Sequence, residues 1–258
     1  MNKINWGEIA LHSEIEYSKA RGGKPTKHKN FIHIYNKQVP YSGDYNRAVG
    51  VKISDYKSFE KVVEEVEKIH SEKKLDKPDR YDIYPPAMKE ENWQGYLSKR
   101  GYNIHTVVFL CSRSFYKPIP EEIKLYLPSK NEYIKWYYEQ QNLRSHFDEE
   151  YFNLIKPSQL NFIKIFKPYW LIEKDMIKGW VYCANLGEYC RLFEVEIKEE
   201  FRGCGLGTIL LNAIRNEAGK QNAKYVLLST GEDLRKFYEK AGFIECVKNS
   251  VIRLKVME

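Results

Sequence analysis

The segment that most constrains the fold of this chain is a glycine-rich loop, Arg202-Gly-Cys-Gly-Leu-Gly207. It follows a strand-like stretch, residues 189–197, and leads into a segment of helical periodicity, residues 207–219. Glycines let a backbone approach a ligand closely, and the unpaired N–H groups at the start of a helix favour an anion. The loop therefore predicts a phosphate cradle, to which Arg202 adds a charged fork.

Position 208 argues against two other phosphate-binding loops. A Walker A loop requires a lysine before its Ser or Thr, whereas Gly207 is followed directly by Thr208. A dinucleotide-binding fingerprint requires a third glycine where Thr208 stands. A glycine-rich turn that holds no ligand stays open as the alternative.

The loop resembles the R-x-x-G-x-G motif of the GNAT acyltransferases, and Lys236-Phe-Tyr-Glu-Lys-Ala-Gly-Phe243 resembles the later helix and Gly-Phe turn of that family. The resemblance implies an α/β (α+β) GNAT fold, in which a mixed, mostly antiparallel central sheet is flanked by helices. It also implies acetyl-CoA as co-substrate and an amine as acceptor. One departure is Gly231, where the family often has an asparagine.

The resemblance further implies where the cofactor lies, in an opening between the strand ending at Ile197 and a strand at residues 225–229. The pantetheine arm would pair, like an added strand, with Val195, Glu196 and Ile197. The pyrophosphate would rest on the loop, whose cofactor-binding residues are Arg202, Gly203, Cys204, Gly205, Leu206, Gly207 and Thr208.

Chemistry in such a site is a direct attack of an amine on the thioester. The resemblance places Tyr238 near the sulfur, where a phenol can act as general acid, although a core tyrosine is the alternative. Glu194 and Glu196 lie two apart on a strand and should share a face, so either could be the general base or a surface carboxylate. Cys204 is not expected to act as a nucleophile, because no histidine follows His146.

The proline-containing connector Tyr116-Lys-Pro-Ile-Pro-Glu121 predicts a domain boundary, with a first domain of residues 1–117 and a second of residues 118–258. The first half repeats the order of strands, helix, strand, helix and strand. After Ile53, however, it has no arginine and no glycine cluster before its helix. We therefore expect a degenerate GNAT-like first domain without a cofactor loop, and a catalytic second domain.

The periodicity predicts individual elements in both halves. The expected helices are residues 5–19, a helix capped by Ser58, and residues 90–99, 131–141, 158–166, 207–219 and 233–241. The expected strands are residues 31–35, 48–53, 81–84, 103–111, 169–173, 176–183, 189–197, 225–229 and 251–256.

Composition narrows the setting of the protein. The 258 residues are 43% hydrophobic, as in a folded globular chain, and no stretch is long and apolar enough to span a bilayer. The five cysteines form no CxxC pair and the histidines show no ligand spacing, so neither disulfides nor a metal site is expected. No signal peptide is recognisable, and we expect a cytoplasmic protein.

Three classes of function remain. The first is an acyl-CoA-dependent N-acetyltransferase that acts on a primary amine of a small molecule or peptide. The second is a non-catalytic acyl-CoA sensor or interaction module. The third, nucleic-acid binding, rests only on the net charge of +7, which is mixed with acidic residues and predicts no specific nucleic-acid site. The sequence does not identify the acceptor, the acyl chain or the oligomeric state.

Overall fold

The computed structural model describes residues 4–39, 46–53, 55–75, 80–83, 98–99, 101–143 and 149–254. Contacts divide the chain into two compact units. The first unit comprises Met1–Phe109, Thr230–Arg235 and Glu245–Glu258, and the second comprises Leu110–Ser229 and Lys236–Ile244. The boundary near residue 117 and the degenerate character of the first half stay predictions.

The strands of the first unit are β1 (Lys24–Lys27), β2 (Ile32–Tyr35), β3 (Arg47–Val51), β4 (Arg80–Ile83) and most of β11 (Ile244–Leu254). β1, β2 and β3 pair antiparallel in succession, β3 pairs parallel to β4, and β4 pairs antiparallel to β11. A parallel pair needs a crossover connection, and α2 (Tyr56–Lys73) lies in the chain between β3 and β4.

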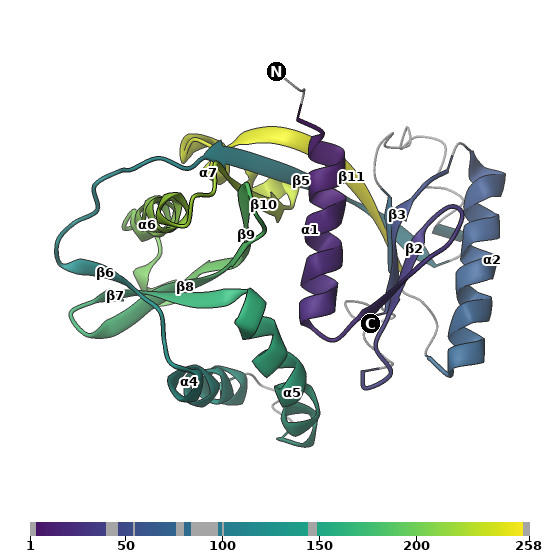
Figure 1. Cartoon of the computed structure of the whole chain (residues 1–258), viewed down its shortest axis with the longest axis horizontal. Coiled ribbons are helices and arrows are strands. Elements are labelled where there is room, and N and C mark those ends of the chain that lie inside the picture. The colour runs from purple at the N-terminus through teal and green to yellow at the C-terminus, as the bar shows by residue number, and fades with distance from the viewer. Residues whose placement is uncertain are drawn as a thin grey trace. The chain divides into compact units, whose positions relative to one another are not determined.

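A helix covers each face of this sheet. Figure 1 shows α1 (Trp6–Ala20) on one side of β2 and β3, and α2 on the other. β3 is buried along its whole length, as expected for a strand covered on both faces. The core on the α2 side consists of Phe31, Ala48, Val51, Phe59, Val62, Val63, Val66 and Tyr102 of β5 (Tyr102–Arg113).

The start of α2 corrects one prediction. Asp55, not Ser58, is the N-cap residue, because its carboxylate accepts a hydrogen bond from the Ser58 amide at 2.8 Å. The Ser58 hydroxyl oxygen accepts in return from the Asp55 amide at 3.1 Å, which completes a capping box. One donor at the start of this helix, the Ser58 amide, is thus occupied by the carboxylate of the chain's own Asp55.

The strands of the second unit are β6 (Ile123–Tyr126), β7 (Lys167–Glu173), β8 (Met176–Asn185), β9 (Tyr189–Ile197) and β10 (Tyr225–Thr230, up to Ser229). β6 to β9 form an antiparallel meander, and β9 pairs parallel to β10. Lys174 and Asp175, which join β7 to β8, both have positive φ, as the tightest hairpin turns require.

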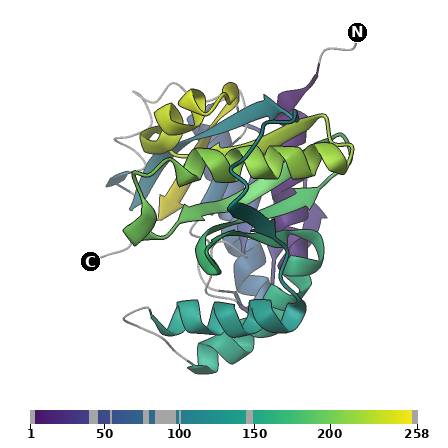
Figure 2. The same ribbon diagram turned by 90° about the vertical axis from the view of Figure 1, so that its left-hand side faces the viewer.

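Helices flank this sheet as well. In Figures 1 and 2, α6 (Leu206–Lys220) lies on one face, and α4 (Lys130–Asn142) and α5 (Glu149–Ile165) lie on the other. α7 (Glu232–Lys240) follows β10 in the chain. The predicted architecture, a mixed and mostly antiparallel sheet flanked by helices, is confirmed.

Most predicted elements are present, with ends shifted by a few residues. The predicted start of a helix at residue 158 is wrong, because α5 begins at Glu149 and runs continuously through Pro157. Buried residues on both sides of the proline, among them Ile155 and Phe162, hold the helix together. The sequence did not predict the short strands β1 and β6, and residues 90–97 lie outside the described residues. No helix in the described part is both long and apolar enough to cross a membrane.

His33 on β2 lies beside two other histidines, His28 and His70. Its side chain is fully buried, and its ring centroid lies 5.0 Å from that of His70 and 6.4 Å from that of His28. Burial, reinforced by His70, His28 and Lys73, lowers the pKa of His33 to about 3. The imidazole is therefore neutral in the folded protein at any mildly acidic pH.

This pKa predicts a loss of stability in acid. Below the ordinary pKa of 6.5 the unfolded chain binds a proton at His33 that the folded chain does not bind. We expect the wild type to lose about 1 kcal/mol from this residue between pH 7 and pH 5.5, and His33→Phe to lose correspondingly less. Denaturant unfolding at both pH values measures this. His12→Gln, a change at an exposed helical histidine, is the control, and an equal loss in His33→Phe and wild type would contradict the assignment.

Candidate active site

The site begins where β9 parts from β10. The two strands pair only over Tyr189–Arg191 and Tyr225–Leu227, although β9 continues to Ile197. On its other edge, β9 has a register shift against β8, with Phe193 opposite Tyr182 and Glu196 opposite Trp180. A bulge of this kind increases the twist of a strand and bends it. The strands therefore diverge where the resemblance places the cofactor opening.

Glu194 lies in this bulge and has an unusual backbone conformation. Its φ is 48°, in the left-handed region, which costs a residue with a side chain about 1 kcal/mol. Such strain concentrates at functional sites, because the bulge redirects a side chain. Glu194 and Glu196 both line a cleft beside the glycine loop, and the bulge interrupts the regular alternation from which their shared face was predicted.

The glycine loop forms an open cradle after β9. A short 3-10 helix, Glu199–Phe201, leads to Arg202, and Gly203 and Gly205 have φ of 82° and 80°. A Cβ placed on either glycine would meet no atom within 4 Å, so both face open space. Gly205 is the N-cap of α6 and provides no side-chain cap, and the Leu206 and Gly207 amides have no acceptor among the described residues. The positive end of α6 is thus open to an anion.

Neighbouring side chains fix the shape of the cradle. Arg202 donates from Nε to the Ile197 carbonyl at 3.1 Å and from NH2 to Glu196 Oε1 at 2.6 Å. The buried Lys178 ammonium lies 3.6 Å from the ring centroid of Phe201. A Cβ on Gly207 would come within 2.9 Å of Phe237, so only glycine lets α6 and α7 approach this closely.

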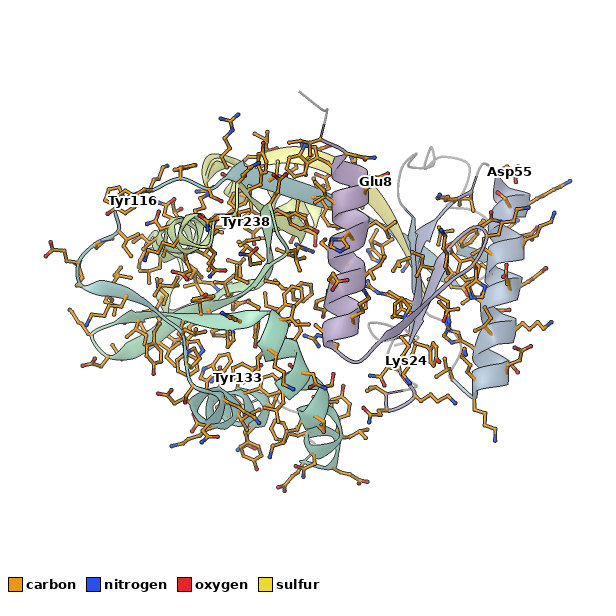
Figure 3. All side chains as sticks on the ribbon, viewed as in Figure 1. Glu8, Lys24, Asp55, Tyr116, Tyr133 and Tyr238 are labelled. Atoms are coloured by element: carbon orange, nitrogen blue, oxygen red, sulfur yellow. The ribbon has the colours of Figure 1, made fainter. Side chains whose placement is uncertain are left out.

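Tyr238 on α7 is the buried phenol of the site (Figure 3). Its side chain is 6% exposed, and its ring makes T-shaped contacts with Phe237 and Phe243. Burial, with a contribution from Glu196 and an opposing one from Arg191, raises the pKa of Tyr238 to about 12. The hydroxyl is therefore protonated at neutral pH and can donate a proton.

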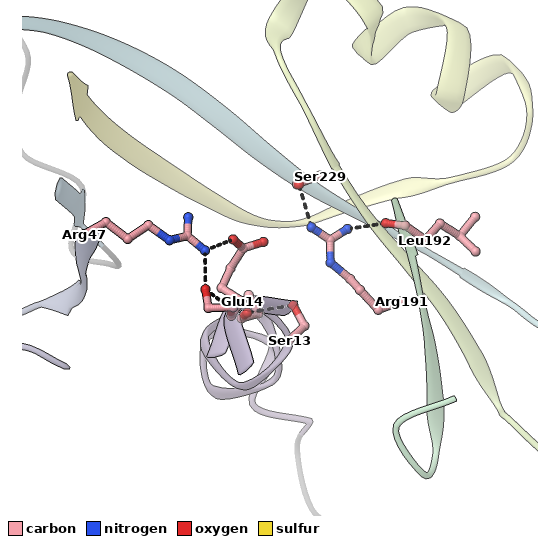
Figure 4. Close-up of polar contacts among 8 residues, drawn as sticks. Ser13, Glu14, Arg47, Arg191, Leu192 and Ser229 are labelled. Carbon is pink, nitrogen blue, oxygen red and sulfur yellow. Dashed lines mark hydrogen bonds and ion pairs between the residues drawn. The ribbon is translucent and has the colours of Figure 1, made fainter. Parts of the chain in front are cut away.

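Arg191 is a residue of the site that the sequence analysis missed. Its buried guanidinium donates to the Ser229 hydroxyl of β10 at 2.7 Å and to the Leu192 carbonyl at 2.9 Å (Figure 4). It belongs to the last registered pair between β9 and β10, so it braces the strands where they part. The signal in the sequence was an arginine between Cys190 and Leu192 in an otherwise apolar stretch.

A cleft of about 510 Å³ adjoins the cradle. Its lining residues are Gln140, Leu143, Trp180, Glu194, Glu196, Lys198, Glu199, Glu200 and Arg202. The four carboxylates outnumber the two cationic side chains, so the cleft has a negative balance. On α4, Tyr133 and Trp136 are buried, and Gln140 is the residue of this helix that lines the cleft.

Cys204 lies exposed in the loop, with its sulfur 3.8 Å from the Arg202 carbonyl oxygen. In the part of the chain that the structure describes, no three His, Cys, Asp or Glu side chains are arranged to hold a metal ion. The helix predicted over residues 233–241 begins one residue earlier, at Glu232. Asp233 lies in its first turn, with a carboxylate oxygen 2.6 Å from where a Cβ on Gly231 would be.

Known proteins resemble part of this chain in sequence. Residues 167–245 match the family model of the acetyltransferase (GNAT) domain. Over 77 residues the chain is 31% identical to the [Ribosomal protein bS18]-alanine N-acetyltransferase of Haemophilus influenzae, which covers 29% of this chain. The chain spans about half (53%) of the length of that relative.

Solved structures resemble the whole chain. A conserved protein of unknown function from Staphylococcus epidermidis has a TM-score of 0.71 at 16% identity, covering 98% of this chain and 99% of its own. A GCN5-related N-acetyltransferase from Kribbella flavida has a TM-score of 0.67 at 12% identity, covering 97% and 96%. At these identities the likeness shows the fold. The chain thus has the GNAT fold, and residues 167–245 match the GNAT acetyltransferase domain.

The strained bulge predicts a gain in stability when its side chain is removed. We expect Glu194→Gly to raise the free energy of unfolding by about 0.5 to 1 kcal/mol, because glycine adopts positive φ without steric cost. Glu196→Gly is the matched control on the same strand, and it should be destabilising. Urea unfolding measures both variants. A destabilised Glu194→Gly would show that the backbone strain is not significant.

Proposed function

We propose that the second half of the chain transfers an acetyl group from acetyl-CoA to a primary amine. The observation that carries the proposal is the start of α6, which has no side-chain cap. This helix follows β9, the strand that parts from β10 beyond Arg191. An anionic group fits there, since both loop glycines face open space and the Leu206 and Gly207 amides have no acceptor among the described residues. Acetyl-CoA supplies an activated thioester to such a site.

The chain's own residues then have distinct roles. Amides from Gly203 to Thr208 would hold the pyrophosphate, and backbone groups of Val195, Glu196 and Ile197 would pair with the pantetheine arm. The arm would occupy the edge of β9 that β10 leaves beyond Arg191. For Arg202 to contact a phosphate, its side chain must exchange its present partner, the Glu196 carboxylate.

Proton transfer would involve Tyr238 and one glutamate. As the amine nitrogen forms its bond to the acetyl carbon, the carbon–sulfur bond breaks and the sulfur takes the proton of the Tyr238 hydroxyl. The attacking amine gives up its proton to the base. We propose Glu194 as the base, because its left-handed backbone holds it in the cleft at a cost in strain, as is frequent for functional residues.

The acceptor would enter the cleft beside these carboxylates. Its negative balance favours an amine that carries positive charge, and Trp180 and Leu143 offer an apolar wall. A small molecule and a peptide N-terminus both satisfy these conditions. We also propose that this reaction takes place in the cytoplasm.

The first unit fits the role of a degenerate second copy. β3, α2 and β4 form a parallel pair joined by a helix, as β9, α6 and β10 do in the second unit. At the start of α2, however, the Asp55 carboxylate occupies the position that an anion would take. A helix start that is already capped by a carboxylate would repel a phosphate.

Acetyl-CoA binding tests the proposed cradle. We expect the wild type to bind acetyl-CoA one to one in a calorimetric titration, and the double variant Arg202→Glu, Gly205→Glu to bind at least tenfold more weakly, since it adds negative charge and fills the loop. Lys57→Glu at the start of α2 is the matched control and should bind as the wild type does. Binding that survives in the double variant would place the cofactor elsewhere.

Turnover tests the catalytic roles against the sensor alternative. We expect Tyr238→Phe to lower kcat by about 100-fold with little change in acetyl-CoA affinity. Because the pKa of Tyr238 is raised to about 12, this acid stays protonated, and kcat of the wild type should not fall with its deprotonation below pH 10.

The two glutamates differ in their expected effect on turnover, and Glu194→Gln should lower kcat more than Glu196→Gln. Steady-state kinetics with a panel of charged and neutral amines measures these effects. Binding without turnover of any amine would favour the sensor.

A further inference from the structure

Arg215 lies in the middle of α6 and is fully buried. Its NH2 group donates to the Ala241 carbonyl at 2.6 Å, and its NH1 group donates to Asn212 Oδ1 at 3.0 Å. The guanidinium carbon lies 4.4 Å from the ring centroid of Phe243 and 5.3 Å from that of Phe115. In the described ranges, no carboxylate lies within ion-pair distance of Arg215.

A buried cation without an acidic partner is costly, and apolar residues of similar volume often replace such groups without loss of stability. Burial lowers the pKa of Arg215 to about 10, so the side chain still carries its charge at neutral pH. Packing of the core alone would be served as well by methionine. The charge therefore requires a separate explanation.

The Ala241 carbonyl explains it. α7 is only 9 residues long and ends at Lys240, followed by the Gly-Phe turn in which Gly242 has φ of 86°. The Gly242 and Phe243 amides satisfy the Glu239 and Tyr238 carbonyls, at 2.9 and 3.0 Å. The Ala241 carbonyl, at the negative end of the helix dipole, accepts from Arg215. A cation on α6 thus caps the C-terminal end of α7.

This cap connects the two parts of the proposed active site. The N-terminal end of α6 forms the cradle, and Tyr238 lies one turn before Ala241. Phe243 contacts both the Arg215 guanidinium, at 4.4 Å, and the Tyr238 ring, at 6.0 Å between centroids. A short helix is marginally stable by itself, so its docking sets where the phenol lies.

We propose that Arg215 is a positioning residue for acetyl transfer, which holds Tyr238 at a fixed place relative to the cofactor helix by capping α7 through the Ala241 carbonyl. The inference rests on the proposed function for its kinetic consequence, and on the geometry alone for its structural one. Arg215 itself exchanges no proton, since the proton that reaches the sulfur comes from Tyr238.

The test compares Arg215→Met, which keeps the volume and loses the donors, with Arg215→Lys, which keeps a single charged donor. Lys220→Met, at an exposed position on the same helix, controls for the loss of one positive charge. Amide hydrogen exchange should become at least tenfold faster over residues 236–243 in Arg215→Met and stay unchanged over residues 206–214. Arg215→Lys should give an intermediate rate.

Kinetics completes the test. In Arg215→Met we expect kcat to fall at least tenfold while the Kd for acetyl-CoA stays within twofold, with partial recovery in Arg215→Lys. A displaced Tyr238 also gains access to water, so its pKa should fall from about 12 toward 10, and the alkaline limb of the kcat profile should move to lower pH.

Failure of the proposed function and failure of the inference about Arg215 would give different results. A wild type that turns over no amine would refute the proposed function, and the exchange rates over residues 236–243 would still decide whether Arg215 caps α7. Wild-type exchange there in Arg215→Met would overturn the inference. A parallel rise over residues 206–214, with kcat lost in proportion to the folded fraction, would also overturn it by showing a general role in stability.

Discussion

The candidate site depends on a strand that loses one of its partners along its length. β9 is paired on both edges at Cys190 and Arg191, and beyond that point it remains paired with β8 but not with β10. The bulge at Glu194 and the buried guanidinium of Arg191 both lie at this transition. A sheet that stayed fully paired would fill the space in which an extended cofactor arm could bind as an added strand.

The start of the helix that follows the strand decides what each unit can bind. Both units place a helix after the first strand of a parallel pair, and both helix starts present unpaired donors. In α2 the Asp55 side chain accepts from one of them, the Ser58 amide, whereas in α6 the N-cap is Gly205 and no side chain caps the helix. The residue type at this one position therefore distinguishes the two helix starts, and it is the basis for the phosphate site that we propose at α6.

The position of Tyr238 depends on α6 as well as on α7, the helix that carries it. Gly207 lets Phe237 approach the start of α6, and Arg215 meets the Ala241 carbonyl further along the same helix. Tyr238 therefore lies between two contacts with α6. Its burial raises its pKa, which suits the role of general acid that we propose for it.

The sequence by itself determined the strand, loop and helix around Arg202 to Gly207, because glycine patterns and hydrophobic period are local properties of the chain. It also pointed to Tyr238, through the resemblance of residues 236–243 to a GNAT motif, and to Glu194 and Glu196, which lie two apart on a predicted strand. Only the tertiary structure decided that β9 carries a bulge, since a bulge is defined by its register against β8. For the same reason the roles of Arg191 and Arg215 were invisible, because the environment of a buried charge is set by distant segments: Ser229 for the first, Ala241 for the second.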